Sequence, residues 1–221
     1  MLKKIRQVGL LYSIGIMINR IVPDWLFRFR IFRVYQVAPK TVLPVSAVSD
    51  NDPVQVSLAE TDADVSAVSA LTYFNPDDVD ADLQSAQAKI DGRLAGAVWV
   101  AGRGFDETDL GLRIELNSDQ SWIFAALVDK QFRRRGVYSR VFGFMVNHLE
   151  QAAVGGQFLS INPCNFASVK AHEKYIDCVL GNVIALRVFG IAFCLCSGPR
   201  LKPSSWISIN SKSQPILIQL G

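Results

Sequence analysis

The chain has 221 residues, half of them hydrophobic, and its formal net charge is only +3. This composition excludes a disordered chain and is sufficient for one large domain, or for one domain with an appendage. Four cysteines form no C-x-x-C pair and only two histidines are present, so we expect no metal site and reduced thiols in a cytoplasmic protein.

The first forty residues differ from the rest of the chain in charge. They contain eight Lys or Arg and one acid, whereas residues 41–221 contain fifteen Lys or Arg and nineteen acids. Apolar residues recur there at helical spacing, and arginines then alternate with aromatic and aliphatic side chains. The apolar positions are Leu11, Ile14, Ile18, Ile21 and Trp25, and the alternating stretch is Phe27–Arg33. This pattern predicts a basic amphipathic arm.

Such an arm docks on a protein surface or lies on an anionic membrane. Its uncharged run, residues 8–19, is too short to span a bilayer. No nucleic-acid-binding module accompanies it, so we expect no nucleic-acid partner. Prolines at 39, 44 and 53 mark a linker, and they divide the chain into an arm with linker, 1–45, a domain, 46–198, and a tail, 199–221.

The domain begins with an alternating strand at 54–59 and helices at 62–70 and 75–86. Residues 50–91, which include these elements, contain ten acids and one base. These acids either belong to solvated helix N-termini or form a rim that attracts a cationic amine. Strands at 86–90 and 94–100 form a hairpin around Asp91-Gly92, and strands at 110–116 and 121–128 should pair.

A strand, a basic loop and a helix follow one another between Ser121 and Ala153. The strand ends at Val128, three arginines occupy 133–135, and Gly136 begins a helix with apolar residues three to four apart. A helix N-terminus has free N–H groups and partial positive charge, and glycine allows an anion to approach the backbone. The arrangement favours a phosphate site at 133–139, although a solvated basic loop would have the same sequence.

A second stretch places hydrogen-bonding side chains along one helical stripe. Asn165, Ser168, His172 and Tyr175 are three, four and three residues apart. They indicate either a binding face or an Asn cap followed by a polar outer face. An apolar run from Gly181 to Cys196 predicts a closing hairpin, with short strands at 207–209 and 216–220 in the tail.

The stretch Val128–Tyr138 resembles the acetyl-CoA-binding signature of the GNAT superfamily of N-acyltransferases. That signature is Arg or Gln, two residues, Gly, one residue, and then Gly or Ala, after a strand that ends in Val. Arg133 and Gly136 match it, whereas Tyr138 stands where a small residue is usual. The order of the elements also fits, and the resemblance extends over about residues 54–196.

The second stretch is similar to the GNAT motif Asn, two residues, Ala or Ser, three residues, Tyr or another polar residue. Asn165 and Ser168 match it, and His172 stands where a Tyr often protonates the departing thiolate. The Gly-Phe that commonly follows is replaced by Ile176-Asp177. The resemblance implies that this helix faces the CoA arm, with His172 or Tyr175 as the acid.

The resemblance implies an α/β (α+β) fold whose central mixed, mostly antiparallel sheet is flanked by helices and splayed at its two central strands. The sequence adds an extra N-terminal amphipathic helical arm. Acetyl-CoA would bind in the splay as a co-substrate, without a metal. The implied cofactor-binding residues are Leu127, Val128, Arg133, Arg134, Arg135, Gly136, Val137, Tyr138, Ser139, Asn165 and Ser168.

We therefore expect an acetyl-CoA-dependent N-acetyltransferase in which a primary amine of a small molecule or peptide attacks the thioester directly. The amine must first lose a proton, and Glu115, one strand away, is the candidate base, with a surface strand residue as the alternative. A longer acyl group and the oligomeric state stay open.

The alternative is a catalytically degenerate CoA-binding module that docks through its basic arm on a protein partner or, peripherally, on the inner membrane surface. The absent Tyr and Gly-Phe favour it.

Overall fold

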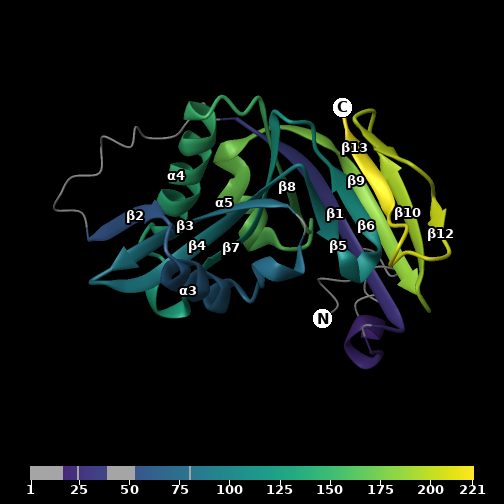
Figure 1. Cartoon of the computed structure of the whole chain (residues 1–221), viewed down its shortest axis with the longest axis horizontal. Coiled ribbons are helices and arrows are strands. Elements are labelled where there is room, and N and C mark those ends of the chain that lie inside the picture. The colour runs from purple at the N-terminus through teal and green to yellow at the C-terminus, as the bar shows by residue number, and fades with distance from the viewer. Residues whose placement is uncertain (1–16, 24, 39–52, 80) are drawn as a thin grey trace.

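The computed structural model describes residues 17–23, 25–38, 53–79 and 81–221. A nine-stranded sheet with the order β12-β10-β9-β1-β8-β7-β4-β3-β2 forms the centre of the protein (Figure 1). In chain order its strands are β1 (Phe27–Val37), β2 (Val54–Leu58), β3 (Asp82–Ile90), β4 (Arg93–Gly102), β7 (Gln120–Val128), β8 (Gly156–Ile161), β9 (Ile176–Val188), β10 (Ile191–Ser197) and β12 (Ile207–Ser208). Every neighbouring pair is antiparallel except β7 and β8. The expected mixed, mostly antiparallel sheet is thus confirmed.

Three α-helices of the described chain flank this sheet. They are α3 (Asp62–Thr72), α4 (Val137–Gln151) and α5 (Phe166–His172), and short 3-10 turns are η2 (Pro76–Asp78), η3 (Thr108–Leu110), η4 (Lys130–Phe132) and η5 (Glu173–Tyr175). The side chain of Thr61 caps α3 by accepting a hydrogen bond from the N–H of Asp64. The helix expected at 75–86 is wrong beyond η2, because Asp82 already begins β3.

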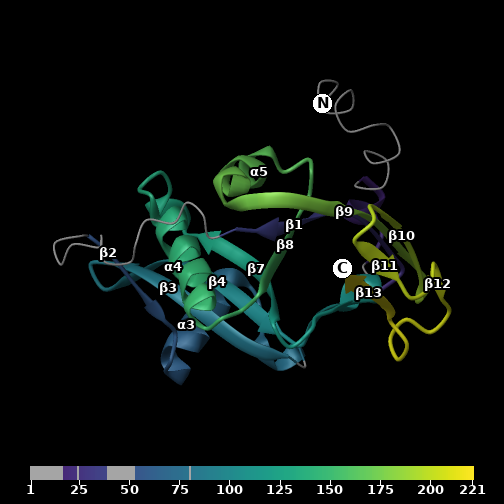
Figure 2. The same ribbon diagram turned by 90° about the horizontal axis from the view of Figure 1, so that it is seen from above.

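The helices cover opposite faces of the sheet. Along β4, Val98 and Val100 pack in the core beneath α4, whereas Ala97 and Trp99 pack against Val68 of α3. Successive side chains of a strand point to opposite faces, so α3 and α4 lie on different sides. Figure 2 shows α4 along β3 and β4, and α5 beside β9. Among the described residues, no helix combines the length and the apolar character needed to cross a lipid bilayer.

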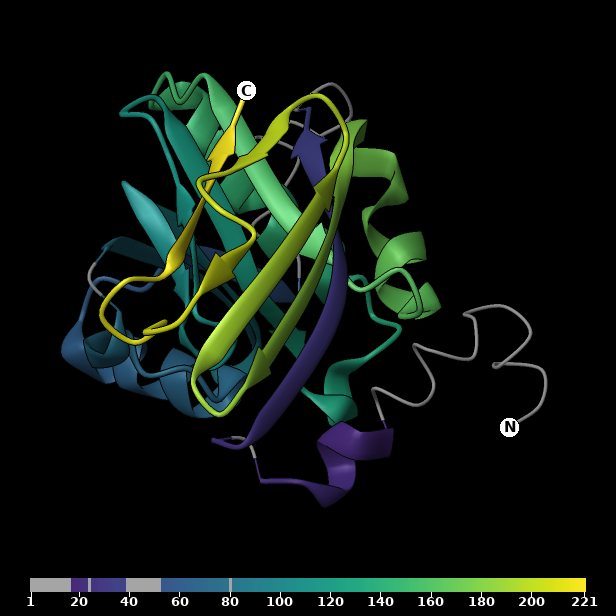
Figure 3. The ribbon, with the colours of Figure 1, turned by 90° about the vertical axis from the view of Figure 1, so that its right-hand side faces the viewer.

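The N-terminal strand β1 lies between β8 and β9, well inside the sheet (Figure 3). Arg33 is the register partner of Ile161 on one side and of Asn182 on the other. The predicted helical arm therefore does not extend through Phe27–Val37. Residues 17–21 are helical, and residues 1–16 lie outside the described part of the chain. The alternation of arginine with apolar residues is the two-residue period of a strand.

A second sheet of four strands has the order β11-β13-β6-β5. Its strands are β5 (Gly104–Glu107), β6 (Leu112–Glu115), β11 (Leu201–Pro203) and β13 (Ile216–Leu220). The predicted C-terminal strands are thus present, and Ile216 and Ile218 are buried in the same core as Phe32 and Val34 of β1. The expected pairing of the strands at 110–116 and 121–128 is wrong, because β6 pairs with β5 and β13 in this second sheet whereas β7 belongs to the central sheet.

Candidate functional site

The strands β7 and β8 are joined only at their beginnings. Their parallel ladder runs from Gln120 opposite Gly156 to Ile123 opposite Leu159, and it stops there. β7 continues to Val128 paired with β4 alone, while β8 continues beside β1. The second half of β7 therefore has no partner strand on its β8 side among the described residues. This is the predicted separation of the two central strands.

A β-bulge lies in β7 where the two strands separate. Trp99 of β4 faces Phe124, but Ala97 faces Leu127, so two steps along β4 correspond to three along β7. Ala125 takes up the extra residue with a φ of 46°, a conformation that L-residues adopt at a cost. A bulge redirects the backbone and side chains that follow it. It therefore changes the direction of the Leu127 and Val128 backbone at the unpaired edge.

The loop after β7 presents positive charge at the N-terminus of α4. Arg133, Arg134 and Arg135 are exposed, and Gly136 begins the helix with a φ of 76° and without a side-chain cap. Arg135 lies over the Phe132 ring at 5.7 Å from its centroid. The N–H groups of the first helical turn, which includes Val137 and Ser139, therefore face the basic loop without a capping side chain. The geometry suits an anion with oxygen acceptors.

The predicted stripe extends from the N-cap of α5 through η5, and its first member, Asn165, caps α5. The side chain of Asn165 accepts a hydrogen bond of 3.2 Å from the N–H of Ser168. Nδ1 of His172 lies 2.8 Å from the carbonyl oxygen of Ser168. A carbonyl oxygen only accepts, so Nδ1 of His172 bears the proton and Nε2 is left as an acceptor.

Tyr138 joins the first turn of α4 to α5. Its hydroxyl hydrogen-bonds to Nε2 of His172, and since Nε2 is an acceptor the hydroxyl is the donor. The hydroxyl of Tyr175 donates a second bond of 2.9 Å, to the carbonyl oxygen of Ser139. The rings of Tyr138 and His172 pack on Phe142, with centroids 5.5 Å and 5.0 Å away. Tyr138, which stands where the GNAT signature usually has a small residue, thus packs between α4 and α5.

Burial keeps this pair of side chains neutral. Desolvation raises the pKa of Tyr138 well above its ordinary value, and the nearby Tyr175 acts in the same direction. Desolvation lowers the pKa of His172, and the bond to the Ser168 carbonyl opposes that effect only in part. A neutral His172 has one N–H, which is held by Ser168. It is therefore not placed to donate a proton.

Glu115 is not brought to this site. It lies at the end of β6 in the second sheet, where Nε2 of Gln219 donates a 3.0 Å hydrogen bond to its carboxylate. The turn that follows leads back to Gln120, at the opposite end of β7 from Val128. The pairing of β6 with the C-terminal β13 explains this position. The role predicted for Glu115 as a base therefore has no geometric support.

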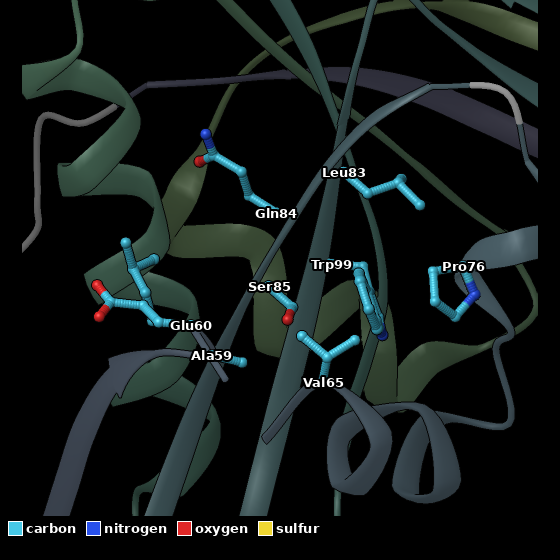
Figure 4. Close-up of a pocket in the computed structure, with 9 residues that line it drawn as sticks. Ala59, Glu60, Val65, Pro76, Leu83, Gln84, Ser85 and Trp99 are labelled. Atoms are coloured by element: carbon cyan, nitrogen blue, oxygen red, sulfur yellow. The ribbon is translucent and has the colours of Figure 1, made fainter. Parts of the chain in front are cut away.

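A pocket of about 310 Å³ lies between α3 and the strands β3 and β4, and sequence reasoning did not identify it (Figure 4). Its polar lining includes Glu60, Gln84 and Ser85. Its apolar lining includes Trp99, whose register partner on β7 is Phe124, the residue before Ala125 of the bulge. The pocket therefore adjoins the separated strands from the α3 face. Glu60 belongs to the acidic stretch 50–91, which was the available signal in the sequence.

Comparison with solved structures agrees with this architecture. A protein from Novosphingobium aromaticivorans DSM 12444 that is assigned to the GNAT family of acetyltransferases superposes with a TM-score of 0.50 at 15% sequence identity, over 72% of this chain and 65% of the other. The chain described here therefore has the GNAT fold. The identity is low, and the likeness extends to the fold alone.

Two further solved structures are similar to this chain. One is a conserved protein of unknown function from Staphylococcus epidermidis ATCC 12228, with 13% identity over 85% of this chain and 66% of the other, and a TM-score of 0.48. The second is a GCN5-related N-acetyltransferase from Kribbella flavida, with 12% identity, 70% and 54% coverage and a TM-score of 0.44. The chain spans less than two thirds of the length of each of these three structures.

No model of a known protein family matches the sequence, and no curated protein matches it.

Proposed function

We propose that this protein transfers an acetyl group from acetyl-CoA to a primary amine. The observation that supports this proposal most is the separation of β7 and β8 beside the uncapped, basic N-terminus of α4. In the proposed complex the amide-rich pantetheine arm bonds the edge of β7 at Leu127 and Val128 that lacks a partner strand, and it replaces the 3.4 Å hydrogen bond that Nε of Arg133 donates to the Val128 carbonyl. The pyrophosphate lies at the first turn of α4, near Arg134 and Gly136, where N–H groups and guanidinium groups both favour an anion.

The amine is proposed to enter from the pocket on the α3 face. This pocket is lined by Trp99, whose register partner Phe124 precedes the bulge, and among the described residues that line it the acidic one is Glu60. A primary amine with a pKa of about 10 is mostly protonated at neutral pH, so it must lose a proton before it attacks the thioester carbon. We assign the receipt of that proton, through water, to the exposed carboxylate of Glu60.

The attack forms a C–N bond and breaks the C–S bond, and the electron pair leaves on sulfur. A thiol has a pKa of about 8.5, so the thiolate is stabilised by a hydrogen bond from a neutral donor and takes its proton from the amine or from water. We assign this donor role to the hydroxyl of Tyr138, which His172 holds in the absence of substrate. Tyr175 positions the same helix turn through the Ser139 carbonyl.

Calorimetric titration with acetyl-CoA tests the cofactor site. Gly136→Glu adds a carboxylate at the proposed pyrophosphate site. Gly136→Gln adds a side chain of the same size and the same backbone strain at a φ of 76°, but no charge. We expect micromolar binding by the natural protein and a much larger loss for Glu than for Gln, with both variants folded by circular dichroism. A folded natural protein that does not bind acetyl-CoA would refute the proposal.

Thiol release with a panel of amines tests the reaction itself. Release that depends on an amine would support the transferase. Binding of acetyl-CoA without release for small amines, amino sugars, peptide N-termini and lysine peptides would instead identify a CoA-binding module without turnover.

A further inference from the structure

The turn between β9 and β10 exposes large apolar side chains to solvent. Phe189 occupies this two-residue turn with a φ of 50° and is 73% exposed. Its N–H donates to the carbonyl oxygen of Leu26, which places Trp25, 70% exposed, beside it. The Ser211 hydroxyl donates to the Gly190 carbonyl, which brings Ile209, 80% exposed, to the same end. We call Trp25, Phe189 and Ile209 the apolar tip.

An exposed row of apolar side chains lies on the strands that adjoin this tip. Ile184 of β9 is the register partner of Leu195 of β10, and Phe193 of β10 is the partner of Ile207 of β12. Cross-strand partners and residues two apart share a face, so these four side chains form one apolar strip. All four are exposed, and β10 and β12 lie at the front of Figure 3. A patch of this kind marks an interaction surface.

The part of the chain that forms this surface is basic. Residues 178–221 contain four Lys or Arg and no Asp or Glu. Lys212 is exposed and follows Ser211, which contacts the β9–β10 turn, and Arg20 is exposed on the short helix that the Asn19 side chain fastens to the Phe29 backbone. The described residues of the acidic stretch, 53–79 and 81–91, lie at the other end of the sheet, with β2 and β3 (Figure 1). Two acids near the apolar tip, Glu107 and Asp109, lie within ion-pair distance of Arg30 and Arg28.

We propose that the apolar tip and the apolar strip dock on the surface of an anionic lipid bilayer. Aromatic side chains are favourable at the interface between lipid and water, where Trp and Phe can bury their rings. Lys and Arg beside them are attracted to anionic headgroups. Symmetric docking of a second copy would instead bring two basic ends together, which like-charge repulsion opposes.

Co-sedimentation of the full chain with vesicles tests this assignment. We expect binding to vesicles of phosphatidylcholine mixed with phosphatidylglycerol, and much weaker binding to phosphatidylcholine alone or in high salt. Binding should also shift the tryptophan emission to the blue, because Trp25 and Trp206 are exposed whereas Trp99 and Trp122 are already buried.

Phe189→Asn removes the central side chain of the tip, and asparagine tolerates a positive φ better than phenylalanine. It should lower vesicle affinity at least about tenfold while the fold is retained. Tyr73→Asn is the matched control, because Tyr73 is also an exposed aromatic residue at positive φ, 90% exposed, on the acidic part of the chain. It should leave vesicle binding unchanged.

Three results would overturn the proposal. The first is no binding to anionic vesicles, and the second is an equal effect of Phe189→Asn and Tyr73→Asn. The third is a dimer in sedimentation velocity that Leu195→Glu dissociates in the absence of lipid, which would assign the apolar strip to a second copy of the chain.

Discussion

The hydroxyl of Tyr138, on the first turn of α4, donates a hydrogen bond to Nε2 of His172 at the end of α5. The bond connects α4, which follows β7 along the chain, to α5, which follows β8. It also determines the tautomer of the imidazole together with the Ser168 carbonyl. The two helices are therefore coupled at the position where the proposed cofactor would enter.

Tyr138→Phe should lower the free energy of unfolding by about 1–3 kcal/mol. The substitution keeps the ring packed on Phe142 but leaves the buried Nε2 of His172 without a donor. Urea unfolding at pH 7.5 would measure the change. Tyr73→Phe, which removes a hydroxyl from an exposed ring, should change the stability by less than about 0.5 kcal/mol. Equal effects of the two substitutions would show that the bond contributes nothing.

Stability should decrease as the pH falls below about 6.5, and His172 should contribute to the decrease. Burial lowers its pKa in the folded state below the ordinary value of 6.5, so the unfolded chain takes up the proton first. The contribution is complete above pH 6.5 and is lost as the pH falls toward the lowered folded pKa. Urea unfolding of the natural protein and of His172→Gln across this range would measure it. A constant difference between the two proteins would contradict the expectation.

Arg30→Met should destabilise the protein by about 2 kcal/mol at neutral pH. Arg30 of β1 contacts the Glu107 carboxylate at 2.5 Å, and burial already raises the pKa of that carboxyl. Without Arg30 the Glu107 carboxylate would lose its ion-pair partner. The resulting loss of stability is smaller than for a fully buried pair, because the Arg30 side chain is 40% exposed. Chemical denaturation would measure it. The double variant with Glu107→Gln should recover most of the loss, and a single variant as stable as the natural protein would disprove the coupling.

Gly181→Ala should be much more harmful than Gly102→Ala. A Cβ on Gly181 of β9 would lie 1.9 Å from the carbonyl oxygen of Ser197, so the β9–β10 pair would have to shift. A Cβ on Gly102 of β4 would meet nothing closer than 3.5 Å. We expect a loss of roughly 2–4 kcal/mol for the first and less than about 1 kcal/mol for the second, measured by thermal or urea unfolding. Similar losses would show that the strand pair adapts.

The stretch from Trp122 to Leu149 could be predicted because its signals are local. A buried strand, a basic loop with glycine and a helix with apolar residues three to four apart follow one another, and each element forms where its own residues indicate. The same holds for the β9–β10 hairpin at Gly190. Local signals also indicated Asn165 at the start of α5, where the structure gives it a capping role.

The positions of β1 and of Glu115 could not be predicted because they depend on distant partners. Arg30 contacts Glu107, 77 residues away, and Arg33 contacts Asn182, 149 residues away. Without those partners, a basic segment with alternating apolar residues is indistinguishable from an arm that lies on another surface. Glu115 leaves the central sheet because β13, a hundred residues later, pairs with β6. Sequence spacing contains no information on that pairing.

The place of β1 has a consequence for how the chain is made. It is the first strand of the described chain, but both of its neighbours, β8 and β9, lie beyond residue 155. A nascent chain leaving the ribosome would therefore display an unpaired strand with Phe27, Phe29 and Ile31 for most of its synthesis. Closing such distant contacts is slow, and an unpaired edge invites aggregation meanwhile. Dependence on a chaperone during synthesis, and slow refolding from denaturant, would follow from the position of this single strand.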